Sequence, residues 1–215
     1  MQSVFQYFTN NWSYILELTF QHFQLVATAV VIAILIGVPL GIYLTTNKAL
    51  AEAVLQICAI IMTIPSIALF GLMIPLLSVI NQGIGFLPAL IALILYSQLP
   101  IIRNTYVAIN NVNPDMRDAA IGIGMTTWQR LRQVEIPIAL PVIMAGVRTA
   151  VVLSIGIGAI AAFIGAGGLG VLIDQGISRS NRDMVIAGAI GVSLLSIIAD
   201  SLLGLVQKKL SPKGA

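Results

Sequence analysis

Charge is the scarcest property of this 215-residue sequence. Asp, Glu, Lys and Arg make up 9% of it and hydrophobic residues 58%, whereas soluble domains average about 25% charged residues. Mean hydropathy is +0.99. These values exclude an ordinary soluble domain and indicate an integral membrane protein. The length allows about five or six spans of ~20 residues and leaves no room for a separate soluble domain. We therefore expect residues 1–215 to form a single all-α, polytopic membrane domain.

Chemistry-bearing residues are equally few. The one cysteine, Cys58, lies in an apolar run, which excludes an internal disulfide and favours a buried, inert thiol. The one histidine, His22, suits packing at the outer end of a span better than proton relay. The sequence has no phosphate-binding loop of the G-x-x-x-x-G-K-[ST] type and no G-x-S-x-G or H-E-x-x-H motif. We expect no catalytic residue, cofactor or metal site, and the small net charge of +3 is too scattered to indicate nucleic-acid binding.

The apolar runs predict about five spanning helices. We expect the first over residues 25–44, and two more in the charge-free interval between Glu52 and Arg103, with a break at residues 81–83. A fourth is expected over residues 138–162 and a fifth over 184–206, joined by a Gly-rich connection. Prolines 65, 75 and 100 should kink the second and third spans or open their hydrogen-bond ladders. Residues 1–20 are rich in aromatics and lack a basic region, so they predict an interfacial segment rather than a secretory signal.

Residues 113–137 form a polar island between long apolar runs. Asn113 is a suitable N-cap and Pro114 a suitable first helical residue. Gly122 and Gly124 can adopt the positive φ that ends a helix, and Thr126 with Gln129 predicts a capping box for the next one. Such an island must lie outside the hydrocarbon, where a water-soluble partner can dock on it.

The island carries a spaced motif. Asp118-Ala119-Ala120 is followed after three residues by Gly124, and after nine more by Val134, then Ile136-Pro137. This spacing resembles the cytoplasmic "EAA" loop of ATP-binding-cassette importer permeases (E-A-A, three residues, G, nine residues, I-x-L-P), with Asp118, Val134 and Ile136 in place of Glu, Ile and Leu. The resemblance implies a coupling helix that contacts cytoplasmic ATPases through Asp118, Ala119, Ala120, Gly124, Val134, Ile136 and Pro137.

The basic residues indicate the orientation. With the island in the cytoplasm, nine of the eleven Lys and Arg residues fall on or toward that side, and only Arg179 and Arg182 lie outside. The nine are Lys48, Arg103, Arg117, Arg130, Arg132, Arg148, Lys208, Lys209 and Lys213. Five spans then predict an external N-terminus and a cytoplasmic C-terminus.

Further segments look like the permease subunits of osmoprotectant importers for glycine betaine, carnitine or choline. They are residues 63–66, 73–77, 87–89, 96–105, 141–149 and 163–170, and the similarity runs over about 25–212. It implies a bacterial inner-membrane permease that works with two ATPases, which bind the ATP and Mg, with a second permease subunit, either a copy or a paralogue, and with an extracytoplasmic binding protein. A permease for methionine or ergothioneine remains an alternative. A secondary transporter is a weaker one, because we find no internal repeats or intramembrane relays.

Several residues are candidates for the translocation path or a gate. Arg148 and Asp200 lie well inside their spans, where a lone charge is costly, so a structural pair is favoured over a role in the path. Tyr96 or Phe70 could attract a quaternary ammonium ion through an aromatic face, and Arg103 could extend to the inner interface. Gly165, Gly167 and Gly170 satisfy G-x-G-x-x-G, but no strand precedes them, which argues against dinucleotide binding. With Gly168 they predict either flexible backbone at the outer face or a turn with close helix packing.

Overall fold

The computed structural model describes residues 4–210, and all regular structure in that range is helical. The elements in chain order are α1 (Val4–Asn10), α2 (Trp12–Leu44), α3 (Lys48–Thr63), α4 (Ser66–Ser78), α5 (Phe86–Asn110), α6 (Pro114–Gly122), α7 (Thr127–Arg130), the π-helix η1 (Leu131–Glu135), α8 (Ile136–Ile160), the 3-10 helix η2 (Ala161–Ile164), α9 (Gly170–Ser178) and α10 (Arg182–Leu210).

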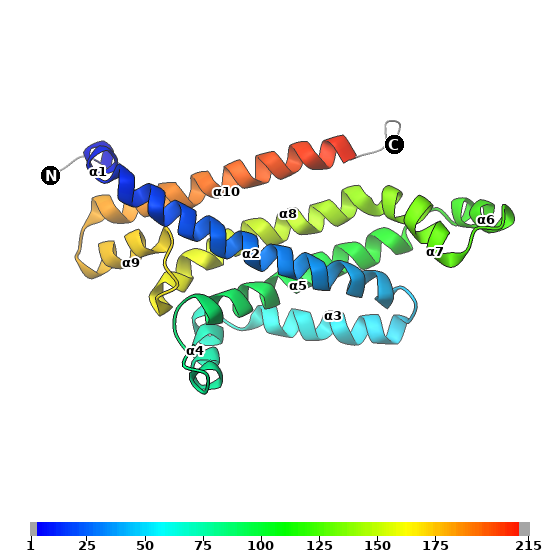
Figure 1. Ribbon diagram of the computed structural model, residues 1–215, viewed down its shortest axis with the longest axis horizontal. Coiled ribbons are helices and arrows are strands. Elements are labelled where there is room, and N and C mark those ends of the chain that lie inside the picture. The colour runs from blue at the N-terminus through cyan, green and yellow to red at the C-terminus, as the bar shows by residue number, and fades with distance from the viewer. Residues whose placement is uncertain (1–3, 211–215) are drawn as a thin grey trace.

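The long helices form a bundle in which α2, α5 and α10 run in one direction and α3 and α8 in the other (Figure 1). Helix α2 packs along α5 and α8. Helix α5 also packs along α8 and α3, and α10 packs on α8 and α9. Figure 1 places α1 and α9 at one end of the bundle, and α6, α7 and the last turns of α10 at the other. The polar island and the end of α10 therefore share one side, as the topology prediction requires.

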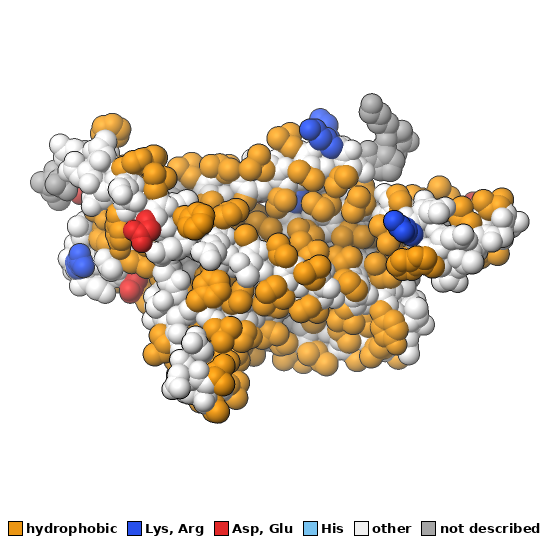
Figure 2. Space-filling model, in the orientation of Figure 1, with side chains coloured by type: hydrophobic (Ala, Val, Ile, Leu, Met, Phe, Trp, Pro, Cys, Tyr) orange, Lys and Arg blue, Asp and Glu red, His pale blue; other side chains and the backbone are white. Residues whose placement is uncertain are grey.

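Four of the described helices are long and apolar enough to cross a membrane, and the bent pair of α3 and α4 raises the total to as many as five. The expectation of about five spans agrees with the upper value. Apolar side chains, coloured orange, cover much of the surface seen in Figure 2, and charged side chains are few. A surface rich in apolar and poor in charged side chains suits contact with hydrocarbon.

The helix that contains the first predicted span starts earlier than residue 25. Helix α2 begins at Trp12 and runs unbroken to Leu44, so residues 12–20 are continuous with that span. Only α1, over Val4–Asn10, stands apart from it. No helix breaker interrupts residues 12–24, and Ile15 and Leu18 are buried in a cluster with Leu172 and Met184. This tertiary packing favours continuing the helix.

The second span is bent by 100° between α3 and α4. Pro65 clashes with a helical conformation of the preceding residue, and Ile64 accordingly has an extended backbone with φ −69° and ψ 128°. Pro75 and Pro100, in contrast, lie inside α4 and α5 without ending them. The expected break at residues 81–83 falls in the turn before α5, as predicted.

Helices α5 and α8 approach closely because α8 carries Gly146 at their contact. A Cβ placed at Gly146 would lie 2.6 Å from the carbonyl oxygen of Pro100, closer than any side chain tolerates. Small residues at helix contacts are typical of membrane bundles, since they let backbones approach and gain dispersion contacts. This contact holds the central pair of spans in register.

Candidate functional site

The polar island folds as two short helices joined by a tight turn. The Asn113 side chain accepts a hydrogen bond from the Asp115 N–H at 2.8 Å, and Pro114 occupies the first turn of α6. Thr126 and Gln129 form the reciprocal capping box at the start of α7. The N-cap predicted at Asn113 and the capping box predicted at Thr126 are both confirmed. These local bonds satisfy N–H groups that have no partner within the first turn of a helix.

The turn depends on one glycine rather than two. Gly124 has φ +82° and its position is open, whereas Gly122 is the last residue of α6 and has no positive φ. The two alanines also differ: Ala119 is exposed beside Asp118, but Ala120 is buried. The two alanines therefore differ in their exposure to a partner, because residues adjacent in a helix point about 100° apart.

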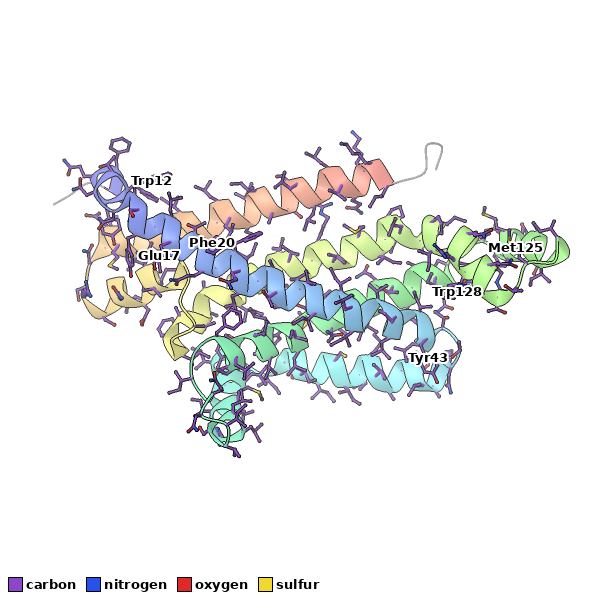
Figure 3. The ribbon with its side chains drawn as sticks, in the orientation of Figure 1. Trp12, Glu17, Phe20, Tyr43, Met125 and Trp128 are labelled. Carbon is purple, nitrogen blue, oxygen red and sulfur yellow. The ribbon has the colours of Figure 1, made fainter. Side chains whose placement is uncertain are left out.

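Apolar side chains of the polar island, residues 113–137, are exposed to solvent. Ile123 is 75% exposed, and Met116, Ile121 and Trp128 are exposed as well. Figure 3 shows Met125 on the part of the island that protrudes from the bundle and Trp128 closer to the bundle's end. Exposed apolar side chains grouped in this way are typical of protein contact sites. We call Met116, Ile121, Ile123 and Trp128, together with Asp118 and Ala119, the docking surface.

A buried carboxylate fixes this surface to the bundle, and the sequence analysis missed it. The Glu135 side chain is only 7% exposed, and its Oε1 lies 2.8 Å from Arg130 Nε and 3.4 Å from Arg117 Nε. Arg117 also donates through Nη2 to the Ile109 carbonyl oxygen near the end of α5. We call Arg117, Arg130 and Glu135 the ion clamp. It ties α6 and α7 both to the span that enters the loop and to the one that leaves it.

The π-helix explains why the clamp was hard to see in the sequence. Arg130 and Glu135 are five residues apart, a spacing that does not bring side chains together on an α-helix. In η1 (Leu131–Glu135) the backbone bonds run from i to i+5, so residues five apart come onto one face. The only sequence signal was a single acidic residue within a basic stretch just before an apolar span.

The remaining motif residues lie at the end of η1 and the start of α8. Val134 and Ile136 are half-buried, and Pro137 is exposed in the first turn of α8. Ile136 packs with Leu131 against Ile109 and Ile143. These residues join the loop to the core between α5 and α8, so displacement of the island must also move α8.

Arg148 and Asp200 form the predicted pair. Arg148 donates from Nε to Asp200 Oδ1 at 3.0 Å and from Nη2 to Asp200 Oδ2 at 2.9 Å. A third bond, 2.6 Å long, runs from Arg148 Nη1 to Gln207 Oε1, and Gln207 donates in turn to the Pro141 carbonyl oxygen at 2.7 Å. The two charged side chains remain 31% and 42% exposed in the single chain. The network therefore bridges α8 and α10 across a face that the chain itself leaves partly open.

The other path candidates are scattered. Tyr96 is buried and donates from its hydroxyl to the Ile64 carbonyl oxygen at 2.6 Å, which supports the bend between α3 and α4. Phe70 is fully buried in the same cluster. Neither aromatic face is open to a ligand in this conformation. Arg103 is exposed on α5, and the structure does not bring it together with Tyr96 or with the glycine stretch.

The glycine stretch packs closely against α2. Gly165, Gly167 and Gly168 have φ values of +78°, +78° and +81°. A Cβ at Gly168 would lie 3.0 Å from His22 Nδ1, and the Gly168 N–H donates to Gln21 Oε1 at 3.1 Å. A Cβ at Gly170 would lie 1.9 Å from the Ala159 carbonyl oxygen. This geometry fits the turn with close helix packing, and His22, which bonds the Ile155 carbonyl oxygen at 3.1 Å, belongs to the same packing.

Comparison with known proteins identifies the family. The model of the family described as "Binding-protein-dependent transport system inner membrane component" matches residues 33–212. The chain belongs to this family. It is thus a multi-pass inner-membrane component of a transport system and not an enzyme.

Named relatives match over nearly the whole chain. The sequence is 58% identical to the osmoprotectant import permease protein OsmW of Salmonella typhimurium over 97% of both chains. It is 42% identical to the glycine betaine/carnitine/choline transport system permease protein OpuCB of Bacillus subtilis, covering 100% of this chain and 96% of that one. Identity to the carnitine transport permease protein OpuCD of Listeria monocytogenes is 42%, with 99% and 93% covered.

Solved structures share the fold. A chain of the MetNI methionine transporter in an inward-facing conformation superposes with a TM-score of 0.82 at 21% identity, covering 92% of this chain and 96% of that one. A chain of an amino acid transporter crystallised with histidines gives a TM-score of 0.79 at 20% identity, with 97% and 100% covered. At this identity the likeness concerns the fold, which is that of an importer permease.

Proposed function

We propose that the chain is the permease of an ATP-driven importer for a compatible solute or quaternary amine such as glycine betaine, carnitine or choline. The observation that carries this proposal is the 58% identity, over 97% of both chains, to a permease named for osmoprotectant import. Relatives named for glycine betaine, carnitine and choline transport point to the same substrate class. The likeness to methionine and amino acid transporters is only at fold level, so it supports an amino acid substrate less well.

The docking surface is the proposed contact with the ATPases. Asp118, Ala119 and Gly124 lie on an exposed loop that the ion clamp holds to the ends of α5 and α8. ATP and Mg would bind in the partner subunits. Their closure would push the island as a rigid body, and the clamp would pass the movement to the spans, which would alternate between inward-open and outward-open arrangements.

The proposed assembly contains more than this chain. Residues 1–215 would act as one permease domain beside a second permease subunit, two ATPases and an extracytoplasmic binding protein. The positive-inside distribution supports an external N-terminus and a cytoplasmic C-terminus, because α6, α7 and the last turns of α10 share one end of the bundle.

Substrate uptake tests the proposal directly. The chain should be expressed with the binding protein and ATPase encoded beside it in cells that lack their own osmoprotectant importers. Labelled glycine betaine, carnitine or choline should then accumulate, and omission of the ATPase should abolish uptake. Accumulation of methionine but none of these solutes, or uptake without the ATPase, would contradict the proposal.

Two variants test the coupling site. Gly124→Trp places a bulky side chain at a positive φ in the docking loop, and Glu135→Gln removes the charge that holds two arginines together. We expect each to lower uptake per folded permease at least about tenfold, since Gly124→Trp blocks close approach of a partner and Glu135→Gln leaves two arginines without the carboxylate that ties them together. Glu52→Gln, the same change in an exposed pair with Lys48, is the matched control and should retain uptake. Normal uptake by both loop variants would exclude this loop as the coupling site.

A further inference from the structure

A cavity of about 600 Å³ opens beside the ion clamp, where α2 ends against α7 and η1. We call it the rim pocket. Its polar part contains Arg117, Arg130 and Glu135, and its mouth carries Tyr43 and Trp128. Its apolar wall includes Pro39 and Ile42 of α2. The ion clamp and Trp128 of the docking surface line this cavity, but the coupling role described above assigns no ligand to it.

The rim pocket lies at the boundary between membrane and water. Tyr43 and Trp128 are both exposed, and Figure 3 shows them near the end of the bundle that carries the island. Aromatic residues of this kind concentrate at the headgroup level of a bilayer. Pro39 and Ile42 precede Tyr43 in α2 and lie on the side of the helix end that leads toward the hydrocarbon. The cavity therefore runs from a polar zone into an apolar one.

The charges facing the pocket leave it net positive. The guanidinium groups of Arg117 and Arg130 share the single carboxylate of Glu135, and these are the charged residues of its lining. Each guanidinium has five N–H donors. Within residues 4–210, the hydrogen bonds of Arg130 use Nε, and those of Arg117 use Nη2. The two side chains are 24% and 28% exposed and Arg117 Nε is buried, so an anion would approach the outer nitrogens of the two guanidinium groups.

We infer that the rim pocket binds the phosphate headgroup of an anionic phospholipid of the adjacent leaflet. Arginines bind phosphate oxygens strongly because two N–H groups can donate in parallel. Basic pockets between membrane helices at the cytoplasmic side suit anionic headgroups. The glycerol and the first acyl carbons would lie along Pro39 and Ile42, which a free phosphate ion could not use. The apolar wall therefore favours a lipid as the source of the phosphate.

Lipid binding here would act on the docking surface. Arg117 and Arg130 also hold Glu135, so a phosphate at the same guanidinium groups adds a negative partner to the clamp and stiffens α6 and α7. The charge of the surrounding lipid would thereby adjust how firmly the docking surface is presented. This inference goes beyond the proposed function, and lipid binding can be measured whether or not the transport proposal holds.

Native mass spectrometry of the intact importer, released from nanodiscs that contain phosphatidylglycerol in phosphatidylcholine, tests the inference. The wild-type protein should retain phosphatidylglycerol in preference to phosphatidylcholine. Arg117→Gln and Arg130→Gln should each weaken retention about fivefold, the effect of one basic residue near an anionic surface. Arg132→Gln removes the same charge from the same loop but lies outside the pocket lining, and it should retain the lipid.

A filling variant keeps the test independent of the charges. Thr46 lines the pocket and is exposed, so Thr46→Trp should occlude the cavity and lower retention while the arginines stay in place. Equal retention by Thr46→Trp, Arg130→Gln and wild type would show general lipid adhesion and overturn the inference. Displacement of the lipid by excess inorganic phosphate would show a free-anion site instead. Retention by the permease alone, lost in the complete importer, would show that the ATPase covers the pocket.

Discussion

The bond between Arg148 and Asp200 makes a prediction about stability that can be measured in a bilayer. We consider the apolar replacements Arg148→Met and Asp200→Leu, alone and together. Each single change leaves one charge near the middle of a spanning helix, since Arg148 lies midway along α8 and Asp200 well inside α10. The double change leaves no charge there.

The expected size follows from the geometry. A lone charge at the centre of a membrane helix costs about 2.5–3.5 kcal/mol on insertion scales. The side chains are 31% and 42% exposed in the single chain, and Gln207 still offers Arg148 an acceptor at 2.6 Å. We therefore expect each single change to lower the free energy of unfolding by about 2 kcal/mol. The double change should cost about 2 kcal/mol less than the two singles added together.

Steric-trapping measurements of the unfolding equilibrium in bicelles provide the assay, with the amount of folded protein in cell membranes as a second readout. Replacement of the neutral member, Gln207→Leu, is the control and should cost less than either charge removal. Losses that add to within about 0.5 kcal/mol would show that Arg148 and Asp200 do not stabilise each other. The same result would refute the reasoning that each of these charges is stable within the membrane because it is paired with the other.

Two other predictions concern packing and topology. Gly170→Ala should lower the melting temperature, because its Cβ would lie 1.9 Å from a backbone oxygen and overpacking costs about 1–3 kcal/mol or more. The control Gly156→Ala, whose Cβ would have nothing within 4 Å, should be nearly neutral. Equal melting temperatures for the two variants would show that the close contact at Gly170 relaxes freely. In a Cys58→Ala background, a cysteine at Gln82 should react with an impermeant thiol reagent in intact cells and one at Asn113 should not, and the opposite pattern would invert the proposed orientation.

The sequence by itself determined the solvent, the approximate number of spans and the local chemistry of the island. Low charge and long apolar runs dictate helices, because in hydrocarbon each backbone group must be bonded within its own segment. The caps at Asn113 and Thr126 could be predicted because their partners lie two or three residues away. The bond between Arg148 and Asp200 could be predicted too, since two opposite charges at similar depth stabilise each other.

Tertiary structure decided those features that need contacts between residues far apart in the chain, or a helix period other than that of the α-helix. Helix α2 starts at Trp12 because residues of α9 and α10 bury its first turns. In the sequence, Gly165, Gly167, Gly168 and Gly170 fit either flexible backbone or a turn with close helix packing. His22 packs directly against Gly168, and Ala159 against Gly170. Glu135 reaches Arg130 only because the backbone widens into a π-helix, and it reaches Arg117 only because α6 packs against η1. A single sequence carries local propensities and hydrophobic periods, but it does not carry the approach of one helix to another, and that approach is what assembles the ion clamp.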